Sequence, residues 1–309
     1  MANSNLTAAK KAKNDEFYTQ ISDIENELKH YKDHFQNKIV YCNCDDPIES
    51  NFCRFFILKF ADYGLKKLIC TAYKTKGHGK VYSCEGDITK DGVINESDLI
   101  VRDLECNGDF RSPECIAFLK EADIVVTNPP FSLFREYIAQ LIEYDKKFLV
   151  IGPDNAITYK EIFPLIKDNK LWLGCNKVKL FTQPNGETKS FGNIGWFTNI
   201  THKKRKEKLT LYKKYNATDF PKYDNYDAIN VDKVTDIPED YNGVMGVPIT
   251  FLDKYCPEQF EILECHEPAT SLEKLKQLSK FKEYKSRQIV VKGVLCQKSY
   301  HRIFIRKKQ

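Results

Sequence analysis

Short apolar runs alternate with amphipathic stretches through the first half of the chain, and this alternation limits the possible folds more than any other feature. The apolar runs predict strands at 38–44, 67–72, 123–127 and 147–152. The amphipathic stretches predict helices at 23–34, 50–63, 113–121 and 132–144. Strands that alternate with helices form a parallel sheet with helices on both faces. We therefore expect an α/β fold with a doubly wound, mostly parallel, Rossmann-like sheet.

The second half of the chain has a different pattern. Residues 178–181 and 192–199 are expected to be strands that extend the sheet, and turn residues become frequent beyond Asp219. Near the end, residues 287–308 are expected to form two strands in a hairpin, with basic residues along it. We place a domain boundary at residue 200, with residues 1–200 forming the sheet and residues 201–309 an α+β extension.

One predicted strand ends in an unusual loop. The apolar run Ile124 to Val126 is followed by Asn128-Pro129-Pro130-Phe131. Proline cannot donate to a ladder, and the residue before each proline is held in an extended conformation. The strand must therefore end in a stiff loop, and ligands bind beyond the carboxyl ends of strands in such sheets. We expect this loop to line a ligand cleft.

The residue types in this loop suit a planar substrate that carries an amine. The amide oxygen of Asn128 and the carbonyl oxygen of Pro129 can each accept one hydrogen of an exocyclic NH2 group. An amine held in this way directs its lone pair outward, where it can attack an electrophilic methyl group. Phe131 would stack on a base that has been flipped out of a duplex. The alternative is a tight loop with a buried Phe131 and no catalytic role.

The net charge of +5 is unevenly distributed. Residues 201–215 hold seven Lys or Arg and one Glu, and residues 271–309 hold twelve Lys or Arg and two Glu, whereas residues 216–270 are strongly acidic. Two basic patches favour an acidic polymer as a partner, although a single charged run is usually only solvated surface. The candidates for phosphate contacts are Lys203, Lys204, Arg205 and Lys206.

Composition narrows the class of protein. No apolar run approaches the roughly 20 residues that span a bilayer, and the first residues lack the apolar core of a signal peptide. The eleven cysteines are odd in number and lie mostly in apolar segments, which predicts reduced thiols in a cytoplasmic protein. Cys42 and Cys44 have no second pair at zinc-ligand spacing, so we expect no metal site.

Several motifs together resemble one family. The chain resembles the EcoRI-type adenine-specific DNA methyltransferases over nearly its whole length. The matching segments are NDEFYT at 14–19, CDDP at 44–47, GDFRSPEC at 108–115, EADIVVTNPPFS at 121–132, WFTN at 196–199, YDNYDAINV at 223–231 and MGVPITFLDKY at 245–255. Asn-Pro-Pro-Phe alone is shared with protein and RNA methyltransferases, whereas the combination is highly specific.

The resemblance implies a reaction and partners. It implies transfer of a methyl group from S-adenosylmethionine to the N6 amine of a flipped adenine in a specific duplex site. Residues 1–200 would form a methyltransferase domain that binds the cofactor, and residues 201–309 a DNA target-recognition region. It also implies double-stranded DNA as substrate, a type II modification role beside a cognate restriction endonuclease, and a monomer in solution.

The resemblance also implies a set of cofactor contacts. Asp46 would meet the ammonium of the cofactor, although the acids before Pro47 could instead cap the next helix. Asp109 and Phe110 would bond and stack on the adenine of the cofactor. The full set implied is Phe17, Tyr18, Thr19, Cys44, Asp45, Asp46, Ser50, Thr71, Asp109, Phe110 and Asn128.

Two features depart from the usual methyltransferase pattern. The turn after the first strand normally holds glycines, but PIESNF at 47–52 has none. The acid usually expected after the second strand, for the ribose hydroxyls, is also missing, because Cys70-Thr71-Ala72 stands there. Asp87 is a further candidate for that contact.

Two alternative functions remain open from the sequence. One is a nucleic-acid-binding regulator with an inactive methyltransferase fold, and the other is an RNA adenine methyltransferase. The intact Asn128-Pro129-Pro130-Phe131 favours an active enzyme over a regulator. Binding of S-adenosylmethionine would discriminate between an active enzyme and a decayed fold.

Overall fold

The chain forms two compact units in its structure, a computed structural model. The structure describes residues 18–44, 48, 50–182, 188–190, 192–223, 226–265, 288–291, 294–297 and 302–308. Unit 1 combines Met1–Ala156 with Leu173–Thr201, and unit 2 combines Ile157–Trp172 with His202–Gln309. The segment 157–172 therefore groups with the C-terminal part of the chain, on the far side of the sequence boundary at residue 200.

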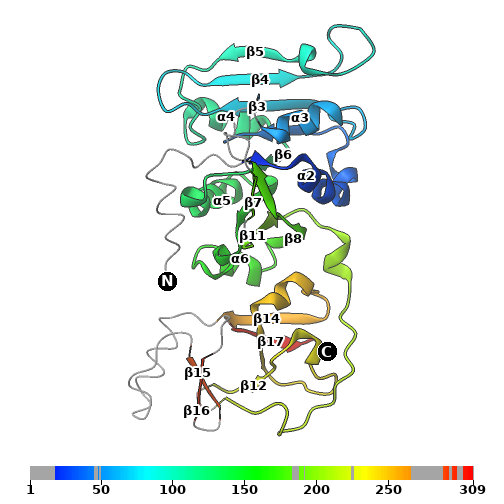
Figure 1. The fold of residues 1–309 in the computed structure, drawn as a ribbon, viewed down its shortest axis with the longest axis vertical. Coiled ribbons are helices and arrows are strands. Elements are labelled where there is room, and N and C mark those ends of the chain that lie inside the picture. The colour runs from blue at the N-terminus through cyan, green and yellow to red at the C-terminus, as the bar shows by residue number, and fades with distance from the viewer. Residues whose placement is uncertain are drawn as a thin grey trace. The chain divides into compact units, whose positions relative to one another are not determined.

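Unit 1 is built on an eight-stranded sheet (Figure 1). Its strands are β2 (Ile39–Cys42), β3 (Lys67–Ala72), β4 (Lys80–Cys84), β5 (Ile100–Asp103), β6 (Ile124–Thr127), β7 (Lys147–Pro153), β8 (Trp172–Lys177) and β11 (Ile194–Thr198). The helices are α2 (Ile21–Leu28), α3 (Asn51–Leu58), α4 (Pro113–Glu121) and α5 (Phe134–Glu143), with 3-10 helices η1 (Lys29–Phe35), η2 (Glu96–Asp98), η3 (Phe131–Leu133) and η4 (Asp154–Thr158).

The strand order in this sheet is β5-β4-β3-β2-β6-β7-β11-β8. The central strands β3, β2, β6 and β7 are parallel, whereas β4, β5 and β11 pair antiparallel with their neighbours. The doubly wound, mostly parallel sheet expected from the sequence is confirmed. The antiparallel strands β4 and β5 at one edge were not predicted.

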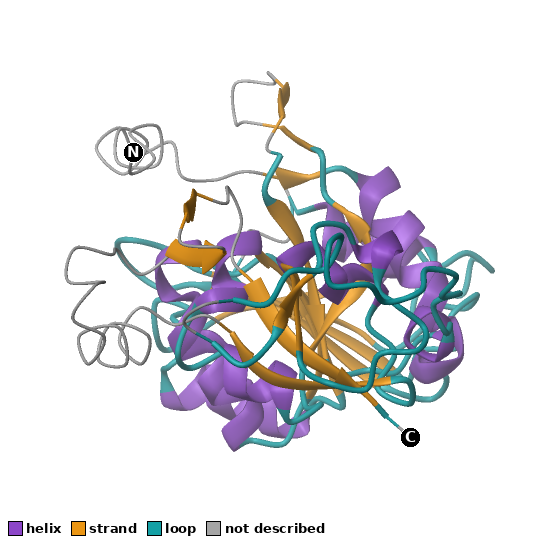
Figure 2. Cartoon of the chain, turned by 90° about the horizontal axis from the view of Figure 1, so that it is seen from below, coloured by secondary structure: helices purple, strands orange, loops and turns teal. Residues whose placement is uncertain are grey.

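Helices cover both faces of the sheet, as Figure 2 also shows. Side chains alternate along a strand, so neighbours in β2 face opposite layers. Val40 and Cys42 belong to the core shared with α2 and α3, whereas the Tyr41 ring lies 6.2 Å from the Phe118 ring of α4. The α3 helix forms because Ser50 caps its first turn and the apolar residues of FCRFFI turn toward the core.

A second, three-stranded sheet corrects one prediction. Strand β9 (Leu180–Thr182) pairs antiparallel with β1 (Tyr18–Thr19) and with β10 (Thr188–Ser190), and it does not extend the large sheet. The prediction that 178–181 extends the large sheet was wrong because its partner comes from the beginning of the chain. The other predicted segment, 192–199, does contain a strand of the large sheet, β11.

Unit 2 contains a four-stranded sheet in the order β12-β13-β17-β14. The bounds are β12 (Ile229–Asn230), β13 (Met245–Pro248), β14 (Phe260–Cys265) and β17 (Arg302–Lys307), with α6 (Phe163–Lys167) and the 3-10 helices η5 (Lys203–Lys206), η6 (Val234–Asp236) and η7 (Ile249–Lys254). Rings of Tyr223 and Tyr226 pack on Phe304 of β17.

Among the described residues of 287–308, the chain forms three strands rather than the two predicted. Strands β15 (Gln288–Val291) and β16 (Val294–Gln297) form the expected hairpin, and β17 is a third strand that joins the four-stranded sheet. The apolar alternation of residues 302–307 is short. Only the pairing of β17 with β13 and β14 shows that these residues are not part of the hairpin. Most of the basic segment 271–309 lies outside the described residues.

Two searches of the described residues gave negative findings. No described helix is long and apolar enough to cross a membrane. No group of three or more His, Cys, Asp or Glu in this part of the chain is arranged to hold a metal ion.

Candidate active site

The carboxyl ends of β2 and β6 meet at the switch point of the large sheet. From β2 the chain continues to β3 on one side, whereas β6 leads to β7 on the other side. Strands β2 and β6 are parallel neighbours, with Tyr41 opposite Val125. Because ligands of such sheets bind beyond this point, the residues that follow β2 and β6 line the expected crevice.

A buried hydrogen bond joins these two strand ends. The Thr127 hydroxyl donates to the backbone carbonyl of Asn43. Both residues are almost fully buried, so the start of the Asn128 loop is fixed against the end of β2. Asn128 itself is half-buried, Pro129 is buried and Pro130 is exposed.

The Asn128 loop then turns into a helix. The Leu133 N–H donates to the Pro130 carbonyl at 2.9 Å, closing the short η3 turn. Phe131 is half-buried and packs against the core of unit 1, while Phe134 is fully buried and contacts Phe197 of β11 with ring centroids 5.1 Å apart. The loop is therefore anchored on both sides, and Asn128 and Phe131 keep part of their surface open.

Tyr137 connects the candidate adenine-binding residues to the strand ends. Its hydroxyl donates to the Asn43 side-chain oxygen, and its ring packs edge-on against Phe110 with centroids 5.0 Å apart. Burial raises the pKa of the Tyr137 hydroxyl well above its usual range, so it stays a donor. Phe110 is thus connected to the end of β2 through Tyr137, a residue of α5 that the sequence analysis did not single out.

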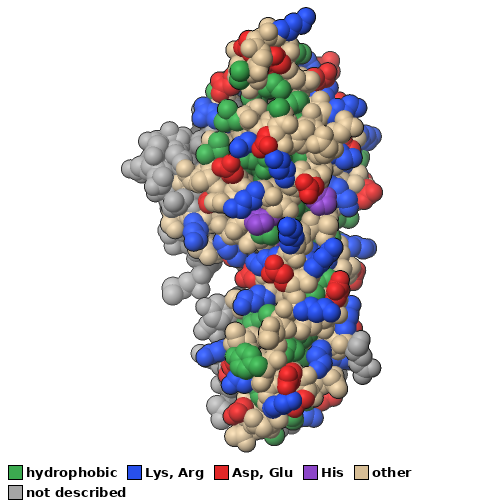
Figure 3. All heavy atoms as spheres, turned by 90° about the vertical axis from the view of Figure 1, so that its right-hand side faces the viewer, with side chains coloured by type: hydrophobic (Ala, Val, Ile, Leu, Met, Phe, Trp, Pro, Cys, Tyr) green, Lys and Arg blue, Asp and Glu red, His purple; other side chains and the backbone are tan. Residues whose placement is uncertain are grey.

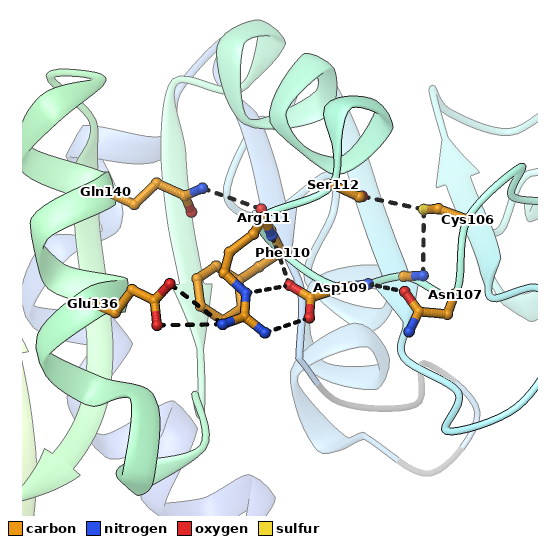
Figure 4. Close-up of polar contacts among 9 residues, drawn as sticks. Cys106, Asn107, Asp109, Phe110, Arg111, Ser112, Glu136 and Gln140 are labelled. Atoms are coloured by element: carbon orange, nitrogen blue, oxygen red, sulfur yellow. Dashed lines mark hydrogen bonds and ion pairs between the residues drawn. The ribbon is translucent and has the colours of Figure 1, made fainter.

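Asp109 is held by an arginine in this structure (Figure 4). The Arg111 side chain donates to both Asp109 carboxylate oxygens, at 2.9 and 2.7 Å, and also reaches Glu136 of α5 at 3.3 Å. The hydrogen bonds from Arg111 hold the pKa of the Asp109 carboxyl below its ordinary value. Asp109 is therefore an ionised acceptor beside the Phe110 ring.

The turn after β2 lacks glycine but adopts a glycine-like conformation. Cys44 has φ of +77°, in the left-handed region that a non-glycine residue rarely occupies. The glycine-free segment 47–52 thus departs from the usual pattern in residue type, while the chain still turns sharply at Cys44. Strained backbone of this kind concentrates at functional sites.

Ser50 and Asn51 bring the turn after β2 next to the first strand. The Ser50 hydroxyl accepts the Phe52 N–H at 3.2 Å and caps α3. The Asn51 side chain donates to the Thr19 carbonyl at 2.7 Å, which joins the beginning of α3 to β1. Phe17, Asp45 and Asp46 lie outside the described residues, as does the side chain of Tyr18.

Thr19 carries a buried polar atom that suits a bound ligand. Its hydroxyl oxygen is buried, and no hydrogen-bond partner for it is found in the described part of the chain. Buried polar atoms are normally paired, so this oxygen is available to a ligand group. The atom belongs to the segment that Asn51 ties to the turn after β2.

Thr71 faces the interior of unit 1. It is fully buried in β3, and its hydroxyl lies 2.9 Å from the Tyr41 hydroxyl. Thr71 lies one residue before the carboxyl end of β3, but its side chain is buried against β2, whereas Asn128 keeps part of its surface open. Asp87 instead organises the β4–β5 connection, where it accepts the N–H groups of Lys90 and Gly92.

Comparison with known proteins identifies the family of the chain. The family model described as adenine-specific methyltransferase EcoRI matches residues 5–308. The chain belongs to the EcoRI-type family of adenine-specific methyltransferases. No solved structure matches the chain.

Three curated relatives of this EcoRI-type chain are type II methyltransferases. M.EcoRI of Escherichia coli is 51% identical over 290 residues, covering 84% of this chain and 88% of the relative. M.MgeORF184P of Mycoplasma genitalium is 40% identical over 324 residues, covering 97% and 98%. M.MpnI of Mycoplasma pneumoniae is 38% identical over 323 residues, covering 97% of both chains.

The candidate DNA-contact residues of this EcoRI-type chain form the short η5 helix in unit 2. Lys203 and Lys206 are exposed and Lys204 is half-buried. Arg205 differs, because its guanidinium lies 3.4 Å from the centre of the Trp172 ring and donates to Asn169 at 2.5 Å. Burial lowers the pKa of Arg205 from its ordinary value. Arg205 thus packs within unit 2, whereas Lys203 and Lys206 are exposed to solvent.

Sequence reasoning missed Asn43, Asn51, Arg111 and Tyr137 around the site of this EcoRI-type chain. Arg111 lies within GDFRSPEC and Asn51 within PIESNF, so the position of each residue in the sequence could have indicated a role near the site. Asn43 and Tyr137 gave no local signal, because their contact joins residues far apart in the chain.

Proposed function

We propose that this chain transfers a methyl group from S-adenosylmethionine to the N6 amine of a flipped adenine in duplex DNA, and that the Asn128 loop carries the reaction. The observation that supports this most is the position of the loop. It follows β6 at the switch point, fixed to Asn43 and adjacent to the Tyr137–Phe110 pair. The membership of the EcoRI-type family supports the same reaction.

The residues of the loop would hold the amine. The Asn128 side-chain oxygen and the Pro129 carbonyl each accept one N6 hydrogen, which leaves the nitrogen lone pair directed away from the loop. Such acceptors act in the transition state because they are already oriented before the reaction begins. Phe131 offers its open ring face to the flipped base.

Other residues of unit 1 would hold the cofactor, which supplies an electrophilic methyl carbon. The buried Thr19 hydroxyl would donate a hydrogen bond to the methionine end of the cofactor. The carboxylates of Asp45 and Asp46 would bind the same end as acceptors. Phe110 would stack on the adenine of the cofactor, and Asp109 would accept its amine. When the cofactor binds, the adenine amine would replace Arg111 as the hydrogen-bond donor to Asp109. The Asp109 carboxylate would therefore still have a donor.

The broader role follows from the relatives. We propose that unit 2, together with the predicted recognition region 201–309, reads the DNA site, and that residues 1–200 carry the cofactor site and catalysis. The curated relatives are named type II methyltransferases. A modification role in the cytoplasm, as a monomer and beside an endonuclease with the same site, is proposed on that basis.

Replacement of Asn128 by Ala tests the proposal. Loss of one oriented hydrogen-bonding group in a transition state costs about 100- to 1,000-fold in turnover. We expect Asn128→Ala to lose methyl transfer to duplex DNA by that factor, measured with radiolabelled S-adenosylmethionine. Binding of the cofactor, measured by isothermal titration calorimetry, should change less than threefold.

The matched control is Ser132→Ala, because Ser132 is exposed and lies four residues further along the same loop and turn. It should keep wild-type turnover. Near-normal turnover of Asn128→Ala would refute the role of the loop. Wild-type protein that binds the cofactor but methylates RNA rather than duplex DNA would point to the RNA enzyme.

A further inference from the structure

Charge alone does not mark a DNA-binding surface on the face of the protein that Figure 3 draws. On the face drawn in Figure 3, Lys and Arg side chains are interspersed with Asp and Glu. The structure of η5 also assigns Arg205 to an internal contact with Trp172, which leaves fewer solvated cations in that run than its sequence suggests. Other features of unit 2 must therefore identify the segment that meets DNA.

The segment 207–215, which follows η5, is extended and fixed at both ends. The Gln259 side chain makes two hydrogen bonds to the Leu209 backbone. Its oxygen accepts the Leu209 N–H at 2.7 Å, and its amide donates to the Leu209 carbonyl at 2.8 Å. At the other end, the Glu239 N–H donates to the Lys213 carbonyl at 2.9 Å, and Asp240 accepts the Tyr215 N–H at 2.7 Å. The backbone between these clamps is therefore held in one path.

Side chains alternate along this fixed segment. Leu209 and Leu211 are half-buried, whereas Lys208, Thr210 and Tyr212 are exposed, as expected for an extended chain with one face against the unit. Tyr212 is 61% exposed, which leaves most of its ring in solvent on a backbone that cannot turn it inward. A single exposed aromatic residue is common, so its surroundings decide its meaning.

The exposed charged residues near Tyr212 in the chain are mostly lysines, and Glu207 is the one acid of the segment 207–215. Lys206, Lys208 and Lys213 are exposed, and no ion pair joins any of them to a carboxylate within the described ranges. Lys214 differs, because it pairs with Glu239 at 2.5 Å. Solvated lysines that flank an open aromatic ring match a polyanion with planar bases, since the lysines meet phosphates and the ring stacks.

We infer that the segment 207–215 of unit 2 contacts duplex DNA, with Lys206, Lys208 and Lys213 at phosphates and Tyr212 stacked on an exposed base or base step. This inference rests on the proposed function. A planar side chain on a rigid backbone can stack on a base that distortion of the duplex exposes. Tyr212 would then be a DNA-contact residue outside the motif residues predicted from the sequence.

The test compares Tyr212→Ala, Tyr212→Phe and Tyr212→Trp with the wild type. Dissociation constants would be measured by fluorescence anisotropy on a duplex that carries the methylation site and on a random duplex. Stacking of one base on an aromatic side chain is removed by alanine at a loss of about 10-fold. We expect that loss on the cognate duplex for Tyr212→Ala, with Tyr212→Phe within twofold of the wild type.

Leu58→Ala is the matched control, because Leu58 is also exposed, at 68%, and is the last residue of α3 in unit 1. It should bind DNA as the wild type does. In a second readout, 2-aminopurine placed beside the target adenine should lose fluorescence when Tyr212→Trp binds, through contact with the indole ring. All variants should unfold at the wild-type temperature, since Tyr212 makes little contact with the core.

Unchanged DNA affinity of Tyr212→Ala would overturn the inference, and equal losses for Tyr212→Ala and Tyr212→Phe would exclude stacking as the cause. Both results are distinct from failure of the proposed function, which would appear as absent methyl transfer by the wild type. If Tyr212→Ala bound DNA normally but failed to bind a partner protein, the segment would be a protein-docking surface and the inference would be wrong.

Discussion

At the scale of single residues, basic side chains in one run have different tasks. Arg205 stands within four consecutive basic residues, yet its guanidinium covers Trp172 and bonds Asn169, both in unit 2. A planar guanidinium suits such a stacked position better than an ammonium does. Arg205 therefore attaches η5 to the segment 157–172, whereas Lys203 and Lys206 of the same run are exposed.

We predict that Arg205→Ala destabilises the protein by about 1–3 kcal/mol, from loss of the cation–π contact and of the bond to Asn169. Urea unfolding followed by Trp fluorescence would measure the change. Lys206→Ala is the control, since Lys206 is exposed, and it should stay within about 0.5 kcal/mol of the wild type. Equal stability of both variants would show that the stacked arginine contributes nothing measurable.

At the scale of elements, a buried acid attaches α2 to β8. Glu27 of α2 is fully buried and accepts the N–H groups of Cys175 and Asn176, each at 2.7 Å, and the Tyr31 hydroxyl at 2.9 Å. Burial raises the pKa of the Glu27 carboxyl, and these donors partly oppose that shift. Because α2 directly follows β1, the hydrogen bonds of Glu27 also help to fix the position of Thr19 in β1.

Gly174 makes this close approach possible. A Cβ atom at Gly174 would lie 2.3 Å from a Glu27 carboxylate oxygen and 2.6 Å from the Trp196 Cβ. We predict that Gly174→Ala lowers the free energy of unfolding by about 1–3 kcal/mol, the usual cost of forcing an extra carbon into a packed core. Thermal unfolding would detect this change.

Gly192→Ala is the control for this prediction, because nothing lies within 4 Å of the corresponding Cβ position. It should unfold at the temperature of the wild type. A neutral Gly174→Ala would mean that α2 and β8 can separate without cost, and that the hydrogen bonds of Glu27 do not position β1.

The elements that the sequence predicted well are those whose signals are local. The strand 67–72 and the helix 113–121 have the predicted bounds, because apolar periodicity, the Ser112 cap and Pro113 all lie within the segment. Strand β9 and the contact of Tyr137 with Asn43 depend on residues distant in the chain, which no local pattern reveals. The Asn128 loop was predictable because two prolines must end a strand.

At the scale of the whole molecule, binding to DNA should depend strongly on salt. Each phosphate that a lysine neutralises contributes roughly −0.9 to the slope of log affinity against log salt concentration. We predict that replacing Lys203 and Lys206 together by Ala makes this slope shallower by about 1.8 and weakens cognate and random duplexes alike. Anisotropy titrations at several salt concentrations would give the slope.

The charge-matched control replaces Lys66 and Lys120, which are exposed in unit 1 and precede β3 and β6, at the edge opposite the strand ends of the candidate site. Its slope should equal that of the wild type. If both double variants kept the wild-type slope, η5 would be only solvated surface, and other cations would carry the phosphate contacts.

The chain passes between the two units at three places, after Ala156, after Trp172 and after Thr201. A gene cut once at residue 200 would therefore leave unit 1 nearly whole in the first fragment but divide unit 2 between the two fragments. The first fragment would carry the α6 segment without β14, which packs against it, and the second would lack Trp172 beneath Arg205. A hybrid enzyme that takes unit 2 from a relative must therefore replace 157–172 and 202–309 together. Unit 2 can be inherited whole only when the gene segments for both ranges are transferred.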